Sequence, residues 1–290
     1  MSIVNMKNML QKAHNGGYAI LHANVINYDM AKTIILVAEE LQSPIIMAVS
    51  EKALRGFSGV SDFASMIKAI VKDSKIQVPV AIHLDHGEYK TVLKAITNGF
   101  SSVMYDGSKL SLKENLKNTR AIVTLAKKHN VTVECEVGAV LGKAEDKGEH
   151  GELATIEECK ALVNAGIDAL AAGVGNLHGN YPKNWKGLNF QRLEEIHKTL
   201  PNTPLVLHGG SGIPDAQIKK AISLGVCKFN VGTEFLIAFT NGLAKYFQNG
   251  KQKDKRGYDP RNYFPWGLEQ VKNVAKEKIK FLGSIDKAKK

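Results

Sequence analysis

The stretch VPVAIHLDHG (78–87) is a short apolar run that ends in two ionisable residues, Asp85 and His86. Two other segments have the same form: ALAAGVGNLHG (169–179) ends near His178, and TPLVLHGGSG (203–212) places His208 directly after its apolar run. Apolar runs that are continuous rather than alternating are typical of strands buried on both faces. The three segments therefore predict parallel strands with polar groups at their carboxyl ends.

Runs of this kind recur along the whole chain, and segments with helical periodicity lie between them. The predicted strands span residues 19–23, 44–49, 78–84, 101–105, 131–137, 169–174, 204–208 and 228–232. The clearest helical segments are 30–41, 62–72, 112–129 and 213–225, with Ser111 as an N-cap for the third. Strands and helices that alternate eight times predict an α/β fold of the (β/α)8, or TIM, barrel type.

The remaining segments fit around one barrel. A helix is expected near residues 5–14, and a helical extension over about 233–290. Because no linker rich in glycine, serine or proline interrupts the chain, we interpret residues 1–290 as a single domain.

The unusual polar residues fall at or near the carboxyl ends of six predicted strands. In such barrels these ends form the face that carries the active site. We therefore expect one site built from Asp85, His86, Asp106, Glu134, Glu136, His178, His208 and Asn230.

Three imidazoles that leave one position open form a typical catalytic zinc site. His86, His178 and His208 are therefore predicted to bind a divalent metal, with Asp85 beside whatever the metal polarises. We expect His83 to support these ligands without binding the metal. Ordinary surface or loop positions are expected for the other histidines, His14, His22, His129, His150 and His197.

Glu134 and Glu136 lie two residues apart and so share one face of their strand. With Asp106 on the neighbouring strand they fit three functions. They bind a second divalent cation, they position the histidines, or they form a buried ion-pair cluster with lysines.

Two turns rich in small residues follow the last two predicted strands: HGGSG (208–212) and NVGTE (230–234). Loops at these places commonly bind phosphate in eight-stranded barrels, because their backbone N–H groups can approach an anion. Gly179 is expected on the same rim.

Composition narrows the class of protein. The net charge is +11, but the excess lysines gather near the C-terminus without interleaved aromatic residues, so nucleic-acid binding is the weaker interpretation. Cys135, Cys159 and Cys227 contain no CxxC pair, which predicts free thiols in a reducing cytoplasm. No secretory segment and no membrane span are expected.

The ordered motifs HLDHG (83–87), MYDGS (104–108), ECEVG (134–138), GNLHGNY (175–181), HGGSG (208–212) and NVGTE (230–234) resemble those of class II ketose-bisphosphate aldolases. The resemblance runs from about Asn24 to Arg261. It implies zinc on the three histidines, Asp85 as catalytic acid/base, and a second cation on Asp106 and Glu136.

The resemblance also implies the positions that meet the substrate. Asn24 and Ser50 line the pocket, and Arg261 in YDPR (258–261) meets the distal phosphate, in some members across a subunit boundary. Contacts to dihydroxyacetone phosphate are implied for Gly179, Gly209, Gly210, Ser211, Asn230, Val231, Gly232 and Thr233.

Two segments depart from the family pattern. In AVLGKAED (139–146), Leu141 replaces one glycine of the family's usual Gly-Gly pair, and the acidic pair that follows is displaced by about one residue. With this displacement, Glu145 is the match for the family's loop glutamate, which handles the proton of the triose carbanion. In LHANV (21–25), the aromatic residue that often precedes Asn24 is missing.

The expected reaction is reversible cleavage of fructose 1,6-bisphosphate to dihydroxyacetone phosphate and glyceraldehyde 3-phosphate. Asp85 takes the C4 hydroxyl proton, Asn230 donates to the developing enediolate, and Glu145 returns a proton. Tagatose 1,6-bisphosphate is the alternative substrate. The resemblance implies a homodimer or homotetramer, and leaves a monovalent cation open.

Two other classes of protein are weaker alternatives. One is a Schiff-base aldolase, which requires a lysine at the carboxyl end of a strand, whereas Lys228 begins its predicted strand at the other end. The other is a basic RNA-binding protein or adhesin built on a barrel.

Overall fold

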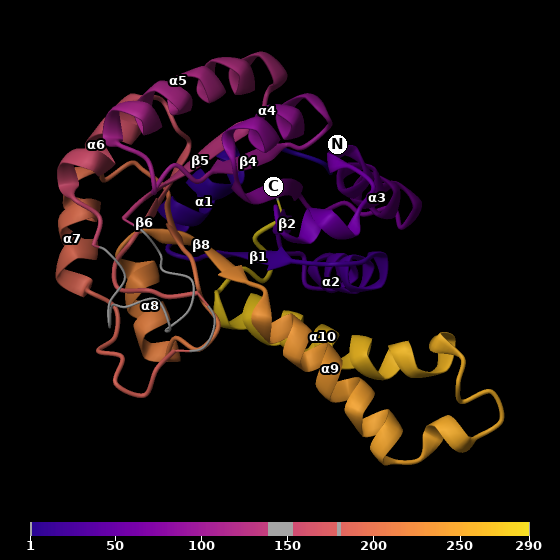
Figure 1. The fold of residues 1–290 in the computed structure, drawn as a ribbon. Coiled ribbons are helices and arrows are strands. Elements are labelled where there is room, and N and C mark those ends of the chain that lie inside the picture. The colour runs from indigo at the N-terminus through magenta and orange to yellow at the C-terminus, as the bar shows by residue number, and fades with distance from the viewer. Residues whose placement is uncertain (1, 139–152, 179–180, 290) are drawn as a thin grey trace.

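The computed structural model describes residues 2–138, 153–178 and 181–289. Its strands are all parallel and close into a barrel in chain order, so the predicted TIM barrel is confirmed (Figure 1). The strands are β1 (Ile20–Asn24), β2 (Ile45–Ser50), β3 (Val80–Gly87), β4 (Ser102–Tyr105), β5 (Thr132–Val137), β6 (Ala169–Ala172), β7 (Leu205–Leu207) and β8 (Val226–Val231).

Helices surround the barrel, and the four helical segments predicted most clearly are confirmed. Ser111 caps α5 as predicted, because its Oγ accepts from the Glu114 backbone N–H at 3.3 Å and donates to the Glu114 carboxylate at 2.7 Å. The helices are α1 (Lys7–Gly16), α2 (Tyr28–Glu40), η1 (Ala53–Gly56), α3 (Val60–Asp73), α4 (Tyr89–Thr97), α5 (Leu112–His129), α6 (Ile156–Asn164), α7 (Phe190–Thr199), α8 (Asp215–Ser223), α9 (Thr233–Gln248), η2 (Lys251–Lys253) and α10 (Pro260–Phe281).

The barrel interior is layered, because every second residue of a strand faces inward. The lower layer is apolar: Ile20, Ile46 and Ala81 pack against Met6 and Leu10, so that α1 and the residue before it close this end. The next inward positions on β1 and β3 are polar, with His22 above Ile20 and His83 above Ala81. A polar layer therefore rests on an apolar floor.

The predicted start of β8 was wrong by two residues. The strand begins at Val226, and Lys228 is a fully buried residue inside it rather than its first residue. A lysine is tolerated there because its Nζ lies 2.9 Å from a carboxylate oxygen of Glu134 on β5.

After β8 the chain forms a pair of packed helices, α9 and α10, which project from the barrel as an arm (Figure 1). The segment that joins them lies at the far end of the arm, and α10 returns toward α2. Residues 233–281 of the predicted C-terminal extension thus form this arm.

Among the residues with a described placement, no helix combines the length and the apolar composition that crossing a membrane requires.

Candidate active site

The site lies at the carboxyl end of the barrel, around a cavity of about 140 Å³. Five strands or the loops after them contribute to its wall, which contains Asn24, Asp85, His178, His208, Gly209, Gly210, Ser211, Asn230, Gly232 and Thr233. Most of the site residues predicted from the sequence are therefore brought together.

A bulge in β3 lets two adjacent residues serve one site. Neighbouring residues of a regular strand point to opposite faces, yet Asp85 and His86 both belong to the site. The register of β3 against β4 shifts between Leu84 and Gly87, and His86 has a φ of 49°, in the left-handed region. Such a bulge redirects a side chain, here the His86 imidazole.

The three predicted metal ligands converge. His86 Nε2 lies 3.2 Å from His178 Nε2 and 3.0 Å from His208 Nδ1. Zinc–nitrogen bonds of 2.0–2.1 Å at tetrahedral angles hold ligand atoms about 3.3 Å apart. The observed separations are close to this value.

The outer nitrogens of two of these rings face carboxylates. His86 Nδ1 lies 3.1 Å from Asp106 Oδ2, and His208 Nε2 lies 2.9 Å from Glu134 Oε1. Because ionised carboxylates only accept hydrogen bonds, these two nitrogens carry the protons. In neutral rings His86 Nε2 and His208 Nδ1 then present lone pairs to each other, an arrangement that a divalent cation between them stabilises. The donor set therefore fits zinc.

The titration of His86 is consistent with a site that attracts a cation. Burial of the ring lowers the pKa of His86, but the charge of Asp85 and the hydrogen bond to Asp106 outweigh it and raise the pKa to about 9. By contrast, burial and then the positive charge of His86 and Lys228 hold the pKa of His208 well below its usual value. One cation, either a proton on His86 or a metal ion, is therefore enough to balance the charge of the three-histidine cluster.

Asp85 is buried and ionised. Burial raises the pKa of its carboxyl group, but the neighbouring positive groups, first His86, bring the pKa well below the ordinary value. Its Oδ2 accepts from Asn24 Nδ2 at 2.8 Å, and its Oδ1 lies 3.4 Å from Asn230 Nδ2. An ionised carboxylate held by two amides can accept a substrate proton.

Asn230 is oriented by Lys228. Its Oδ1 accepts from Lys228 Nζ at 2.9 Å, and because an ammonium only donates, the amide NH2 must lie on the other side, toward Asp85. Asn230 therefore presents donors to the cavity.

The structure favours two of the three functions that the sequence left open for Glu134, namely positioning a histidine and forming a buried ion pair with a lysine. Its carboxylate, buried on β5, contacts both His208 and Lys228, so it positions a ligand within an ion-pair cluster. Asp106 contacts His86 and accepts from the Ser108 backbone N–H at 3.2 Å, and Glu136 is buried two residues beyond Glu134. Neither Asp106 nor Glu136 belongs to a candidate metal cluster among the residues the structure describes.

Sequence reasoning missed two interior residues, His22 and Lys228. His22 was assigned a surface or loop role, which is wrong: it is fully buried on β1, with its Nε2 3.9 Å from Asp85 Oδ2. Burial, and then the charge of Lys228, hold the pKa of His22 well below the usual value, so the ring is neutral. His22 lies two residues before Asn24 and Lys228 two before Asn230, so strand periodicity could have found both.

His83 lies beneath Asp85 on the inward face of β3. Its Nδ1 lies 2.7 Å from Ser102 Oγ, and its Nε2 lies 4.0 Å from Glu134 Oε2. His22, His83 and Asp85 form a second group of potential ligands, but the nearby ammonium of Lys228 disfavours a cation there.

The Glu134 contacts lead to a testable prediction. Glu134→Gln keeps an acceptor for His208 Nε2 but removes the charge, so we expect the affinity for zinc to fall about 10- to 100-fold. Competition with a chromophoric chelator measures this affinity, and circular dichroism checks that the variant is folded. Glu158→Gln, at the N-terminus of α6, is the control. Unchanged zinc affinity would show that the Glu134 charge does not support His208.

The loop after β7 requires glycine at two successive positions. Gly209 has a φ of 66°, and a Cβ there would lie 1.9 Å from the Leu177 carbonyl oxygen. At Gly210 a Cβ would lie 2.4 Å from the Phe229 ring. The loop can therefore follow the cavity wall closely, and the Gly210 N–H ties it to the Asn230 carbonyl oxygen of β8 at 3.2 Å.

Gly232 and Thr233 form the beginning of α9 in the neighbouring part of the cavity wall, since β7 and β8 are adjacent strands. The first N–H groups of a helix have no partner within the helix, so this end can bind an anion. Val231, also predicted to contact substrate, is buried in the core and can contribute only its backbone.

Ser50 and Arg261, both predicted to contact the substrate, do not line this cavity. Ser50 ends β2 opposite Asp85 but does not line the cavity, and its Oγ accepts from the Ala53 backbone N–H. Arg261 begins α10 at the outer end of the arm, where it pairs with Asp259 and its side chain is 78% exposed (Figure 1). Glu145 and Gly179 lie outside the described residues.

Known proteins similar to this chain agree with these features. The family model "Fructose-bisphosphate aldolase class-II" matches residues 4–287. The chain is 47% identical over 288 residues to the fructose-bisphosphate aldolase of Mycoplasma genitalium, covering 99% of this chain and 100% of that protein. It is 43% identical over 293 residues to the enzyme of the same name from Streptococcus pyogenes serotype M1, with coverage of 99% and 100%.

A solved structure shows the same fold. The YdjI aldolase from Escherichia coli K12 superposes with a TM-score of 0.83 at 31% identity, over 99% of this chain and 100% of that one. The match to the family model and the full-length relatives show that this chain belongs to the class II fructose-bisphosphate aldolase family, whose members are metal-dependent lyases.

Proposed function

We propose that this chain cleaves fructose 1,6-bisphosphate reversibly to dihydroxyacetone phosphate and glyceraldehyde 3-phosphate, with zinc on His86, His178 and His208. The observation that supports this most directly is the convergence of three imidazole nitrogens in a polar cavity that also contains the ionised Asp85. A site of this kind can stabilise negative charge and move a proton at neighbouring atoms of one substrate.

When bound, zinc would supply Lewis-acid polarisation of the ketose carbonyl. Asp85 takes the proton of the C4 hydroxyl, and the C3–C4 bond breaks as the C4 aldehyde forms. Asn230, with its amide oxygen held by Lys228, directs its NH2 toward the oxygen on which charge develops. A side-chain carboxyl group of segment 139–146, for which Glu145 is our candidate, delivers the proton to C3 from its protonated form.

The phosphate of the dihydroxyacetone half is assigned to the two loops that follow the adjacent strands β7 and β8. Gly209 and Ser211 supply backbone and hydroxyl donors from the loop after β7, where Gly210 allows the backbone to approach closely, and Gly232 with Thr233 supplies the beginning of α9. Gly179 belongs with this set by its place after His178. We assign Asn24 and Ser50 to the substrate-facing ends of β1 and β2.

A coupled assay that compares the two ketose bisphosphates tests the proposed substrate. We expect kcat/KM for fructose 1,6-bisphosphate to exceed that for tagatose 1,6-bisphosphate by about tenfold or more. Metal analysis of the same sample should find about one zinc per active chain. A reversed preference would assign the chain to tagatose bisphosphate, and no turnover of either would overturn the proposal.

The position of Arg261 favours a homo-oligomer, either a homodimer or a homotetramer. Arg261 does not line the cavity of its own chain, and its helix begins at the outer end of an arm that exposes Leu236, Ile237, Phe247 and Tyr258 by 40 to 78%. An arm with apolar side chains that carries an arginine fits a second copy of the chain, whose distal substrate phosphate the guanidinium then binds.

Mixing two inactive variants tests this arrangement. We expect Arg261→Ala to lower kcat/KM about 10- to 100-fold, because a charged hydrogen bond is lost. When Arg261→Ala and Asp85→Ala subunits are exchanged, half of the dimers contain one complete site, so about one quarter of the wild-type activity should return. Arg256→Ala, in the same arm, is the control for lost charge. Failure to regain activity in exchanged dimers would mean that Arg261 does not act across subunits.

We further propose a cytoplasmic location, which the three free and buried cysteines support. We assign the second divalent cation to Asp106 and Glu136. A monovalent cation is given no site.

A further inference from the structure

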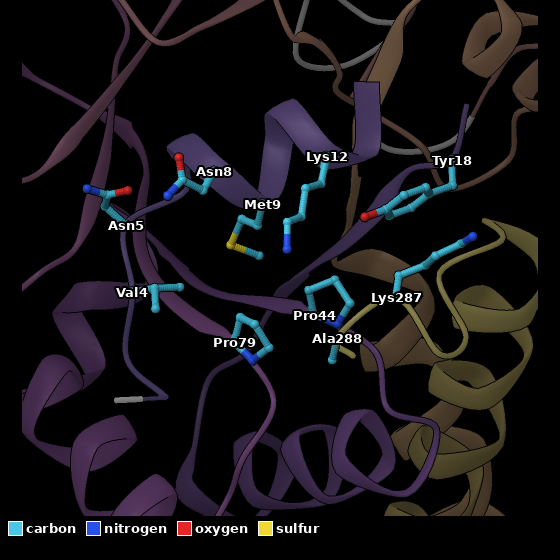
Figure 2. Close-up of a pocket in the computed structure, with 10 residues that line it drawn as sticks. All are labelled: Val4, Asn5, Asn8, Met9, Lys12, Tyr18, Pro44, Pro79, Lys287 and Ala288. Carbon is cyan, nitrogen blue, oxygen red and sulfur yellow. The ribbon is translucent and has the colours of Figure 1, made fainter. Parts of the chain in front are cut away.

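A second cavity of about 140 Å³ is shown in Figure 2. Because Pro44 and Pro79 in its wall directly precede β2 and β3, it lies at the end of the barrel opposite the catalytic site. Three parts of the chain meet around it: the N-terminal segment with α1, the residues that precede β2 and β3, and the segment after α10. Met9, Pro44 and Pro79 give it apolar walls. We call it the basal pocket.

Tyr18 is the buried polar group of the basal pocket. The residue is only 6% exposed, and its ring reaches into the cavity with the hydroxyl toward Lys12 (Figure 2). No hydrogen bond joins this hydroxyl to any residue within the described ranges. Burial, first of all, raises the pKa of Tyr18, so the group remains a donor at neutral pH. The hydroxyl is open to the cavity, so it can donate to an acceptor on a ligand that enters there.

The charge at the basal pocket is positive and uncompensated. Lys12 directs its ammonium into the cavity, and Lys287 lies along the Tyr18 ring with its Nζ 5.3 Å from the ring centroid. No Asp or Glu belongs to the described lining, and neither lysine forms an ion pair with a described residue. The lining therefore favours an anion.

From these observations we infer that the basal pocket binds a small cyclic carboxylate. A cavity of about 150 Å³ can admit a benzene ring. The ring of the ligand would pack against Met9, Pro44 and Pro79, and the carboxylate would accept hydrogen bonds from Lys12 Nζ and Tyr18 Oη. Binding connects α1 to the residues that precede β2 and β3 and so stabilises the folded chain.

Titration of the zinc-loaded protein with benzoate, followed by NMR of methionine methyl groups, tests the inference. The Met9 methyl group lines the basal pocket and reports binding there rather than at the metal. We expect a saturable shift of its resonance, with a Kd of about 1 mM. Benzyl alcohol, which lacks the charge, should bind at least about tenfold more weakly.

Two variants test the proposed contacts. Lys12→Met should weaken benzoate about tenfold or more, and Tyr18→Phe about three- to tenfold, while aldolase activity without benzoate stays unchanged. Lys7→Met, on the same helix, removes the same charge outside the basal pocket and should leave the affinity unchanged. An unmoved Met9 resonance, or equal affinity of the wild type and Lys12→Met, would overturn the inference.

Discussion

Replacing Asp85 with alanine should lower kcat about 10²- to 10⁴-fold, which is the usual contribution of a general base. The carboxylate is buried and ionised, and it is held by Asn24 at 2.8 Å, so it is the group best placed to take the C4 hydroxyl proton. The zinc content should stay at the wild-type level, because the three histidines are intact. Steady-state kinetics with metal analysis of the same preparation measures both quantities.

Asp73→Ala, at the exposed end of α3, is the matched control and should have wild-type kcat. If Asp85→Ala retained full turnover, the proton would have to be taken by another group. If it lost zinc as well as activity, Asp85 would be a ligand or a support of the ligands rather than the base.

Removal of the metal should abolish activity, by about 10³-fold or more, because Lewis-acid stabilisation contributes several kcal/mol. Dialysis against a chelator followed by assay tests this, and added zinc should restore turnover. Far-ultraviolet circular dichroism should show that the barrel persists without metal. The histidines lie above a separate apolar core, which does not depend on the metal.

The same experiment separates this mechanism from Schiff-base catalysis. Lys228 lies inside the barrel, so its position alone would allow a covalent role, but its Nζ contacts Glu134 and Asn230 at 2.9 Å each. An ammonium in an ion pair is not a nucleophile. Borohydride added with dihydroxyacetone phosphate should therefore leave the mass of the protein unchanged, and a trapped adduct on Lys228 would contradict the metal mechanism.

Local sequence patterns predicted the barrel because each strand contains a continuous apolar run. They also predicted which residues meet, since the carboxyl ends of parallel strands share one face. The histidine cluster follows from this rule alone, without knowledge of any contact between His86 and His208.

Errors occurred where a contact between distant strands overrides a local preference. In the sequence, Lys228 looks like the boundary of an apolar strand. Its burial is explained by the ion pair with Glu134, which lies 94 residues earlier in the chain. His22 reads as an isolated histidine until β1 closes against β8 and places it beside Asn230 in the register. The location of Arg261 depends on the direction of the arm, which no periodicity specifies.

The bulge in β3 has a consequence for the geometry of the site. The proposed base and a proposed metal ligand are separated by one peptide unit, and the strained His86 backbone turns both toward the same substrate. Because one peptide unit joins them, the β3 backbone fixes their mutual spacing, whereas their distances to His178 and His208 depend on packing between different strands. The proposed base and the proposed metal ligand therefore keep the relative placement on which proton transfer and charge stabilisation depend.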